Sequence, residues 1–133
     1  MLNRVRPALD PTVDQTIACS PHAPGVARRA VEELGGDVDP GVIRDAQLLV
    51  SEVVTNSIKH SGSDDPIRLR VWARQTGLKV EVAVGGLGFW GEPPAVAGDG
   101  GRGLLILESL ADSWGRTCDM RARVWFELSS RRA

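Results

Sequence analysis

The sequence has few cysteines, no excess of basic residues and no long apolar run, and each absence excludes a class of protein. Its two cysteines, Cys19 and Cys118, lack the spacing of a zinc site and are expected to be buried thiols. The formal net charge is -1, from 16 Lys and Arg against 17 Asp and Glu, whereas nucleic-acid-binding proteins usually carry a basic excess. No apolar run approaches the roughly 20 residues of a membrane span, and the N-terminal residues lack the apolar core of a signal peptide. We therefore expect a cytoplasmic protein that contacts neither nucleic acid nor a membrane directly.

Length and composition indicate one domain with a core of its own. The chain has 133 residues, of which 42% are hydrophobic and 25% are charged, as in soluble globular proteins. Residues 1–13 are expected to be a flexible tail, residues 14–129 a single domain, and residues 130–133 a frayed end.

Two periodicities alternate along this domain. Apolar residues at helical spacing predict helices over residues 24–34, 40–60 and 102–112. Short apolar or alternating segments predict strands over residues 16–19, 67–72, 78–84, 114–118 and 123–128. The expected fold class is α+β: a two-layer sandwich whose mainly antiparallel (mixed) sheet is covered on one face by about three helices.

A polar stripe runs along the second expected helix. Glu52, Asn56 and His60 lie four residues apart, so their side chains project from one side of the helix. Apolar residues occupy the other sides, and a buried polar group is costly unless something polar meets it. The stripe is either a ligand site or a helix edge exposed to water.

Residues 85–103 contain eight glycines and two prolines, too many for a regular element. A loop of this length inside a compact domain is usually functional or mobile. It begins with Gly86-x-Gly88-Phe89 and ends with Gly101-Arg102-Gly103-Leu104, which opens the third expected helix. Either glycine pair alone is compatible with an ordinary turn. The polar stripe followed by both glycine pairs, in this order along the chain, is a more specific signal than either pair alone.

In this order the three motifs resemble the nucleotide-binding fold of gyrase, the large heat-shock chaperone, histidine kinases and MutL. The segments LLVSEVVTNSIKHS, GRGLLILESLADSWG and VWFEL are most similar to the bacterial anti-sigma-factor serine kinases, in particular their single-domain actinobacterial relatives. The resemblance covers roughly residues 20–128.

The resemblance implies a site for ATP and Mg²⁺ on the second helix. Glu52 matches the family's general base, which takes a proton from a hydroxyl group. Asn56 matches the amide that binds nucleotide and coordinates Mg²⁺. Lys59 and His60 match polar or basic positions that face the phosphates, although Lys59 is equally compatible with a solvated side chain.

The glycine-rich segment would supply the rest of the nucleotide site. Gly86 and Gly88 match the first glycine motif, and residues 91–101 match a lid over the nucleotide. Gly101, Gly103 and Leu104 would bring backbone N–H groups to phosphate at a helix start. Arg102 would add positive charge there, or it is simply exposed.

Two positions depart from the family pattern at the adenine end. Val84 stands where relatives carry the aspartate that accepts a hydrogen bond from the adenine amino group. Alignment on VWFEL places Arg123 where relatives carry a threonine of the same network. Val84 also continues the alternation of its strand, so it is also compatible with core packing. The site is therefore expected to be degenerate at its adenine end.

The resemblance implies an ATP-binding regulator that binds a sigma factor or phosphorylates an antagonist protein on serine. The alternative is a pseudokinase-type binding module with weak or no ATP binding. Relatives commonly pair through their sheets, so a homodimer is expected.

Overall fold

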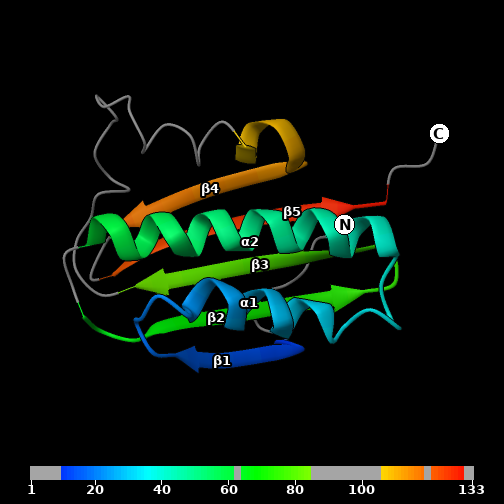
Figure 1. The fold of residues 1–133 in the computed structure, drawn as a ribbon. Helices are drawn as coiled ribbons and strands as arrows, with labels where there is room; N and C mark the ends of the chain where they lie inside the picture. The colour runs from blue at the N-terminus through cyan, green and yellow to red at the C-terminus, as the bar shows by residue number, and fades with distance from the viewer. Residues whose placement is uncertain (1–9, 62–63, 85–105, 119–120, 131–133) are drawn as a thin grey trace.

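The computed structural model describes residues 10–61, 64–84, 106–118 and 121–130. Within these residues, helices lie across one face of a five-stranded sheet (Figure 1). The strand order is β1-β2-β3-β5-β4, and each neighbouring pair is antiparallel. The expected two-layer α+β sandwich is confirmed.

The elements follow the expected order. The helices are α1 (Ala23–Glu32) and α2 (Pro40–Ser61), and residues 106–110 form a further helical segment. The strands are β1 (Val13–Ile17), β2 (Ile67–Arg74), β3 (Gly77–Val84), β4 (Ser113–Cys118) and β5 (Ala122–Ser129). Part of the third expected helix, residues 102–105, lies outside the described residues, and Ala111 and Asp112 follow the helical segment as non-helical residues.

The first strand begins at Val13 rather than at residue 16. Its register on β2 sets Val13 opposite Val71 and Ile17 opposite Ile67, and the side chains of both Val13 and Ile17 pack against the core. The expectation that Val13 belongs to a flexible tail is therefore wrong. The strand was misplaced because its bounds depend on pairing with β2, which lies about fifty residues further along the chain.

Helix α2 begins where the sequence predicts, and it is tied there to the other end of the domain. The Asp39 carboxylate accepts hydrogen bonds from the Gly41 N–H and from the Ser130 hydroxyl, each at 2.9 Å. The Ser130 N–H also donates to the Thr76 carbonyl oxygen at 2.7 Å. Ser130, expected in a frayed end, is thus held in place.

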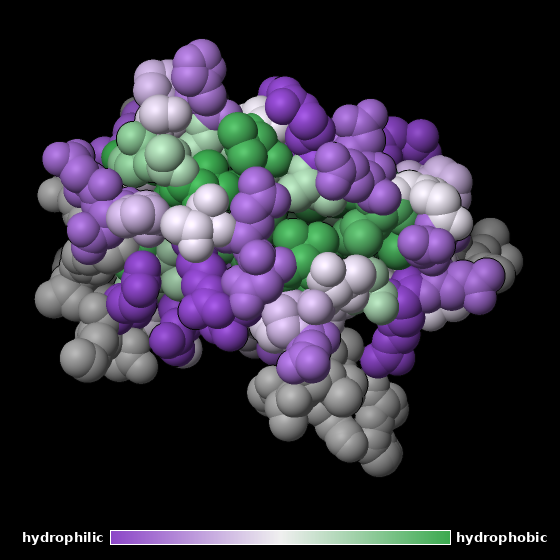
Figure 2. All heavy atoms as spheres, turned by 90° about the horizontal axis from the view of Figure 1, so that it is seen from below, coloured by the Kyte–Doolittle hydropathy of each residue, from purple (hydrophilic) through white to green (hydrophobic). Residues whose placement is uncertain are grey.

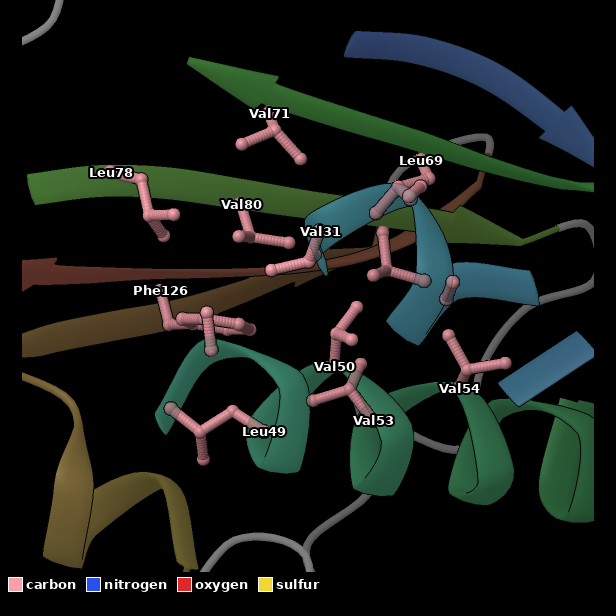
Figure 3. Close-up of a cluster of buried hydrophobic side chains, with 14 of the residues drawn as sticks. Val31, Leu49, Val50, Val53, Val54, Leu69, Val71, Leu78, Val80 and Phe126 are labelled. Atoms are coloured by element: carbon pink, nitrogen blue, oxygen red, sulfur yellow. The ribbon is translucent and has the colours of Figure 1, made fainter. Parts of the chain in front are cut away.

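The core lies between the helices and the sheet. Figure 3 shows Val31 of α1 and Val50, Val53 and Val54 of α2 directed toward the apolar side chains of the sheet. The sheet supplies Leu69, Val71, Leu78, Val80 and Phe126, all of them buried. In Figure 2, a view from the β1 side, apolar side chains form a band across the middle with polar ones around it. α2 contacts β3 and β5, and Figure 1 shows its C-terminal end on the same side as the end of β3.

The other face of the sheet is polar and aromatic, and no described helix covers it. The Lys79 ammonium lies 5.7 Å from the ring centroid of Trp72 and 5.2 Å from that of Trp125. Arg70 forms an ion pair with Glu81 on the same face. A Cβ atom at Gly115 would lie 2.7 Å from the Trp125 indole nitrogen, so this glycine leaves the space that the ring fills. We call this surface the outer sheet face.

Two expectations from composition concern thiols and membranes. Cys19 is half-buried rather than buried, and the side chain of Cys118 lies outside the described residues. No described helix is long and apolar enough to cross a membrane.

Candidate functional site

The C-terminal half of α2 carries the polar stripe into the core. Asn56 is only 6% exposed, and with Ser57 it is one of two buried polar residues in the described part of the chain. Ser57 satisfies its own hydroxyl by donating to the Val53 carbonyl oxygen at 2.8 Å. At Asn56, therefore, the stripe is not a helix edge exposed to water.

Asn56 has an unmet hydrogen-bonding requirement. Its amide nitrogen is buried and has no hydrogen-bond partner among the described residues. A buried polar group left unpaired costs about 1–3 kcal/mol. This side chain therefore lowers the stability of the folded protein when no ligand is bound. Rotation of the amide exchanges its nitrogen and its oxygen, so the same position can offer a carbonyl oxygen to a cation. The structure thus places a buried, unpaired amide at this end of α2, where it could bind a ligand.

The neighbours of Asn56 on the stripe differ in exposure. Glu52, one turn earlier, is half-buried, and Lys59 is exposed. The backbone of His60 continues the helix, but its side chain lies outside the described residues. One face of α2 therefore presents a half-buried carboxylate beside a buried amide, the residue types that suit proton transfer and cation binding.

At the end of β3, Val84 is part of the apolar core. It is 3% exposed and lies opposite Ala122 in the β3–β5 ladder. Ala122 is 1% exposed and belongs to the same core cluster. Both side chains therefore face the helices. The interpretation of Val84 as a core residue is correct.

Arg123 lies on the other face of the sheet. In β5 the residues Ala122, Val124, Phe126 and Leu128 are buried under the helices, and the residues between them point outward. Arg123 is opposite Ala83, not Val84. Since successive side chains of a strand point to opposite faces, placing Arg123 beside Val84 was wrong by one residue. Sequence analysis missed Ala122, although its alternation with Val124 and Phe126 was a signal that could have identified it.

Several expected site residues belong to the glycine-rich segment and the start of the third expected helix. Gly86, Gly88, Gly101, Arg102, Gly103 and Leu104, together with the expected lid over residues 91–101, lie outside the described residues. The helical segment that follows them is anchored by Leu107, which is fully buried in the core. The described part of the expected site therefore consists of the α2 stripe and the end of β3.

The two ends of this site differ in how well they fit ATP and Mg²⁺. Mg²⁺ in proteins keeps several waters and phosphate oxygens and takes one or two protein ligands. The unpaired amide of Asn56 suits such a ligand. The Val84–Ala122 pair does not suit adenine, because neither side chain can form a hydrogen bond. Asn56 therefore fits Mg²⁺, whereas Val84 and Ala122 do not fit adenine.

Comparison with known proteins agrees with the fold. The profile of the histidine kinase-like ATPase domain matches residues 18–123, which is most of the chain. A search of characterised proteins found no match. The matched region includes α1, α2, β2, β3 and β4, and thus the whole polar stripe. The chain belongs to the histidine kinase-like ATPase domain family.

Proposed function

We propose that this protein is an ATP-binding regulator of the anti-sigma-factor serine kinase type, which binds a sigma factor or phosphorylates an antagonist protein. The observation that carries the proposal is the buried, unpaired amide of Asn56 on α2. Bound ATP and Mg²⁺ would supply the phosphoryl group and its charge neutralisation. Asn56 would ligate the cation, and Glu52 would accept the proton of a serine hydroxyl.

Substitution of Asn56 by alanine tests the proposal. The substitution removes the cation ligand together with an unpaired polar group, so Asn56→Ala should weaken Mg²⁺·ATP binding while leaving thermal stability unchanged or higher. We expect a loss of affinity of roughly ten- to hundred-fold, because interactions with charged groups contribute about 1.5–3 kcal/mol. Isothermal titration calorimetry with Mg²⁺·ATP measures the first effect, and thermal unfolding measures the second.

Thr55→Ala is the matched control, since Thr55 is the exposed neighbour of Asn56 on the same helix. It should bind Mg²⁺·ATP as the wild-type protein does. If Asn56→Ala binds Mg²⁺·ATP with unchanged affinity, the proposed site is wrong.

A second candidate is a pseudokinase-type binding module that has kept the fold and its protein partner but binds ATP weakly or not at all. It is favoured by Val84, which lies in the apolar core where the family carries a base-reading aspartate. In this case wild-type protein would bind no nucleotide at millimolar concentration while still binding its protein partner. The titration that tests Asn56 separates the two candidates.

We also propose a homodimer formed through the outer sheet face. This face carries cations and carboxylates in alternation, for example Arg70 beside Glu81, with Trp72 and Trp125 among them. A two-fold interface brings a surface against its own copy and therefore must be self-complementary. A face with both signs of charge and with tryptophans meets that requirement.

A further inference from the structure

Three cations on strands β2 and β3 of the outer sheet face have partners within the chain. Arg68 forms an ion pair with Asp14, and Arg70 forms one with Glu81. The Lys79 ammonium lies near the rings of two tryptophans, which attract a cation through their π-electrons. These three groups therefore need no opposite charge from another molecule.

Arg123 on β5 differs from these cations. It lies opposite Ala83 of β3 and Thr117 of β4, and neither of these residues carries a charge. Its Nε atom is buried and has no hydrogen-bond partner in the described part of the chain. A buried charged group without a partner is costly, and a carboxylate is the group that best satisfies a guanidinium. This position would therefore be stabilised by a carboxylate from another molecule.

Glu127 is the complementary group on the same strand. Like Arg123, it is half-buried and points to the outer sheet face. Its carboxylate accepts a hydrogen bond from the Ser113 hydroxyl at 2.8 Å. The ion pairs between described residues of this face include neither Glu127 nor Arg123. β5 thus presents a guanidinium and a carboxylate that are not ion-paired within the described chain, with Trp125 midway between them.

We infer that Arg123 of one copy pairs with Glu127 of a second copy, and that the two-fold axis of the dimer passes beside Trp125. The inference rests on the proposed homodimer through the outer sheet face and names the contacts that form it. In a two-fold interface each contact occurs twice with the roles of the copies exchanged. The pairing therefore satisfies both groups of both copies.

The dimensions of β-sheets fit this pairing. Residues 123 and 127 are about 13 Å apart along a strand, so two antiparallel copies of β5 centred on Trp125 place an arginine over a glutamate at each end. Sheets that pack face to face lie about 10 Å apart, a gap that an arginine and a glutamate side chain span together.

Reversal of either charge tests the pairing. In Arg123→Glu two carboxylates would face each other at both ends of the interface, and in Glu127→Arg two guanidinium groups would do so. Each variant should dimerise at least about hundredfold more weakly than wild type, because like charges across an interface repel. Analytical ultracentrifugation measures the dissociation constant, and far-UV circular dichroism checks that each variant is folded.

Recombination of the reversed charges is the decisive measurement. An equimolar mixture of Arg123→Glu and Glu127→Arg should dimerise, because each chain supplies at both ends the charge that the other needs. A single chain with both changes should dimerise within about tenfold of wild type. The matched control combines Glu127→Arg with Arg44→Glu. It has the same net charge, but Arg44 is exposed on α2, so this control should remain monomeric.

The outcomes separate the pairing from the proposed homodimer. A monomeric wild-type protein contradicts both. If wild type is a dimer and either single reversal leaves its affinity unchanged, the homodimer stands and the pairing is overturned. Loss of the dimer in both single variants without recovery in the mixture also overturns the pairing, as does recovery in the Arg44→Glu control. Recovery in the mixture and in the doubly reversed chain alone supports it.

Discussion

Asn56 and Ser57 are adjacent in α2 and both are buried, yet only one of them has a hydrogen-bond partner for its polar group. Ser57 bonds to the carbonyl oxygen one turn before it, so its burial needs nothing from outside the helix. The amide nitrogen of Asn56 has no partner among the described residues. A protein that keeps such a group accepts lower stability for function, which is why the proposed site is assigned to Asn56 rather than to Ser57.

Residues on the outer sheet face are polar for a different reason. Asp14 of β1 and Arg68 of β2 form two hydrogen bonds, at 2.9 and 2.8 Å, near the edge of the sheet. The hydrogen bond from the Arg68 guanidinium lowers the pKa of the Asp14 carboxyl below its ordinary value of 3.8. This pair joins β1 to the sheet but is exposed to water, so its contribution is small and sensitive to salt.

The pH dependence of stability follows from that shift. The folded-state pKa of Asp14 is lowered, so the ion pair stabilises the fold above the unfolded-state pKa and loses its effect as the pH falls through the folded-state pKa. Asp14→Asn should therefore lower the unfolding temperature slightly at pH 7, and the difference from wild type should disappear in strong acid. Thermal unfolding from pH 2 to pH 7 measures this. A difference that grows as the pH falls would contradict the assigned role of the pair.

At the scale of elements, the sequence predicted α2 best and the position of the first strand least well. α2 is 22 residues long with a sustained apolar period and an Asp-Pro start, so local signals decide its bounds. β1 has five residues, and its position depends on β2. A short strand contains little information about its own partner.

The error at Arg123 has the same origin. A motif match fixes a strand to within about one residue, and a shift of one residue moves every side chain to the opposite face. The apolar alternation of Ala122, Val124 and Phe126 determines the face from the sequence alone. The pairing of Ala122 with Val84 required the three-dimensional register. The polar stripe on α2 was thus predictable from the sequence, and the pairing of Ala122 with Val84 was not.

The start of α2 provides a test at this scale. One carboxylate oxygen of Asp39 accepts the Gly41 N–H, and the other accepts the Ser130 hydroxyl, so the residue caps the helix and holds the C-terminal end of β5 to it. Asp39→Ala should lower the free energy of unfolding by about 1–2 kcal/mol, measured by chemical denaturation. Asp39→Asn keeps an oxygen that can cap and should lose much less. Equal losses in both variants would contradict capping.

At the scale of the whole molecule, the two faces of the sheet differ in composition, and the two proposals place different functions on them. The inner face, together with α1 and α2, forms the apolar core and holds Asn56 and the Val84–Ala122 pair. The outer sheet face contributes no residue to that core cluster and carries charges and two tryptophans. A partner bound to the outer face would leave the α2 stripe uncovered. The proposed nucleotide binding and the proposed dimerisation should therefore be separable by substitution.

Reversal of one charge on the outer sheet face tests this separation. Lys79 lies between Trp72 and Trp125, so Lys79→Glu should repel the carboxylates of the same face in a second copy. Light scattering should give twice the 14.3 kDa chain mass for wild type and the single mass for the variant. Arg44→Glu makes the same charge change at an exposed position of α2 and should remain dimeric. Far-UV circular dichroism confirms that Lys79→Glu is folded, and its Mg²⁺·ATP affinity should equal that of wild type. A wild-type monomer, or a variant that stays dimeric, would show that the outer sheet face is not the interface.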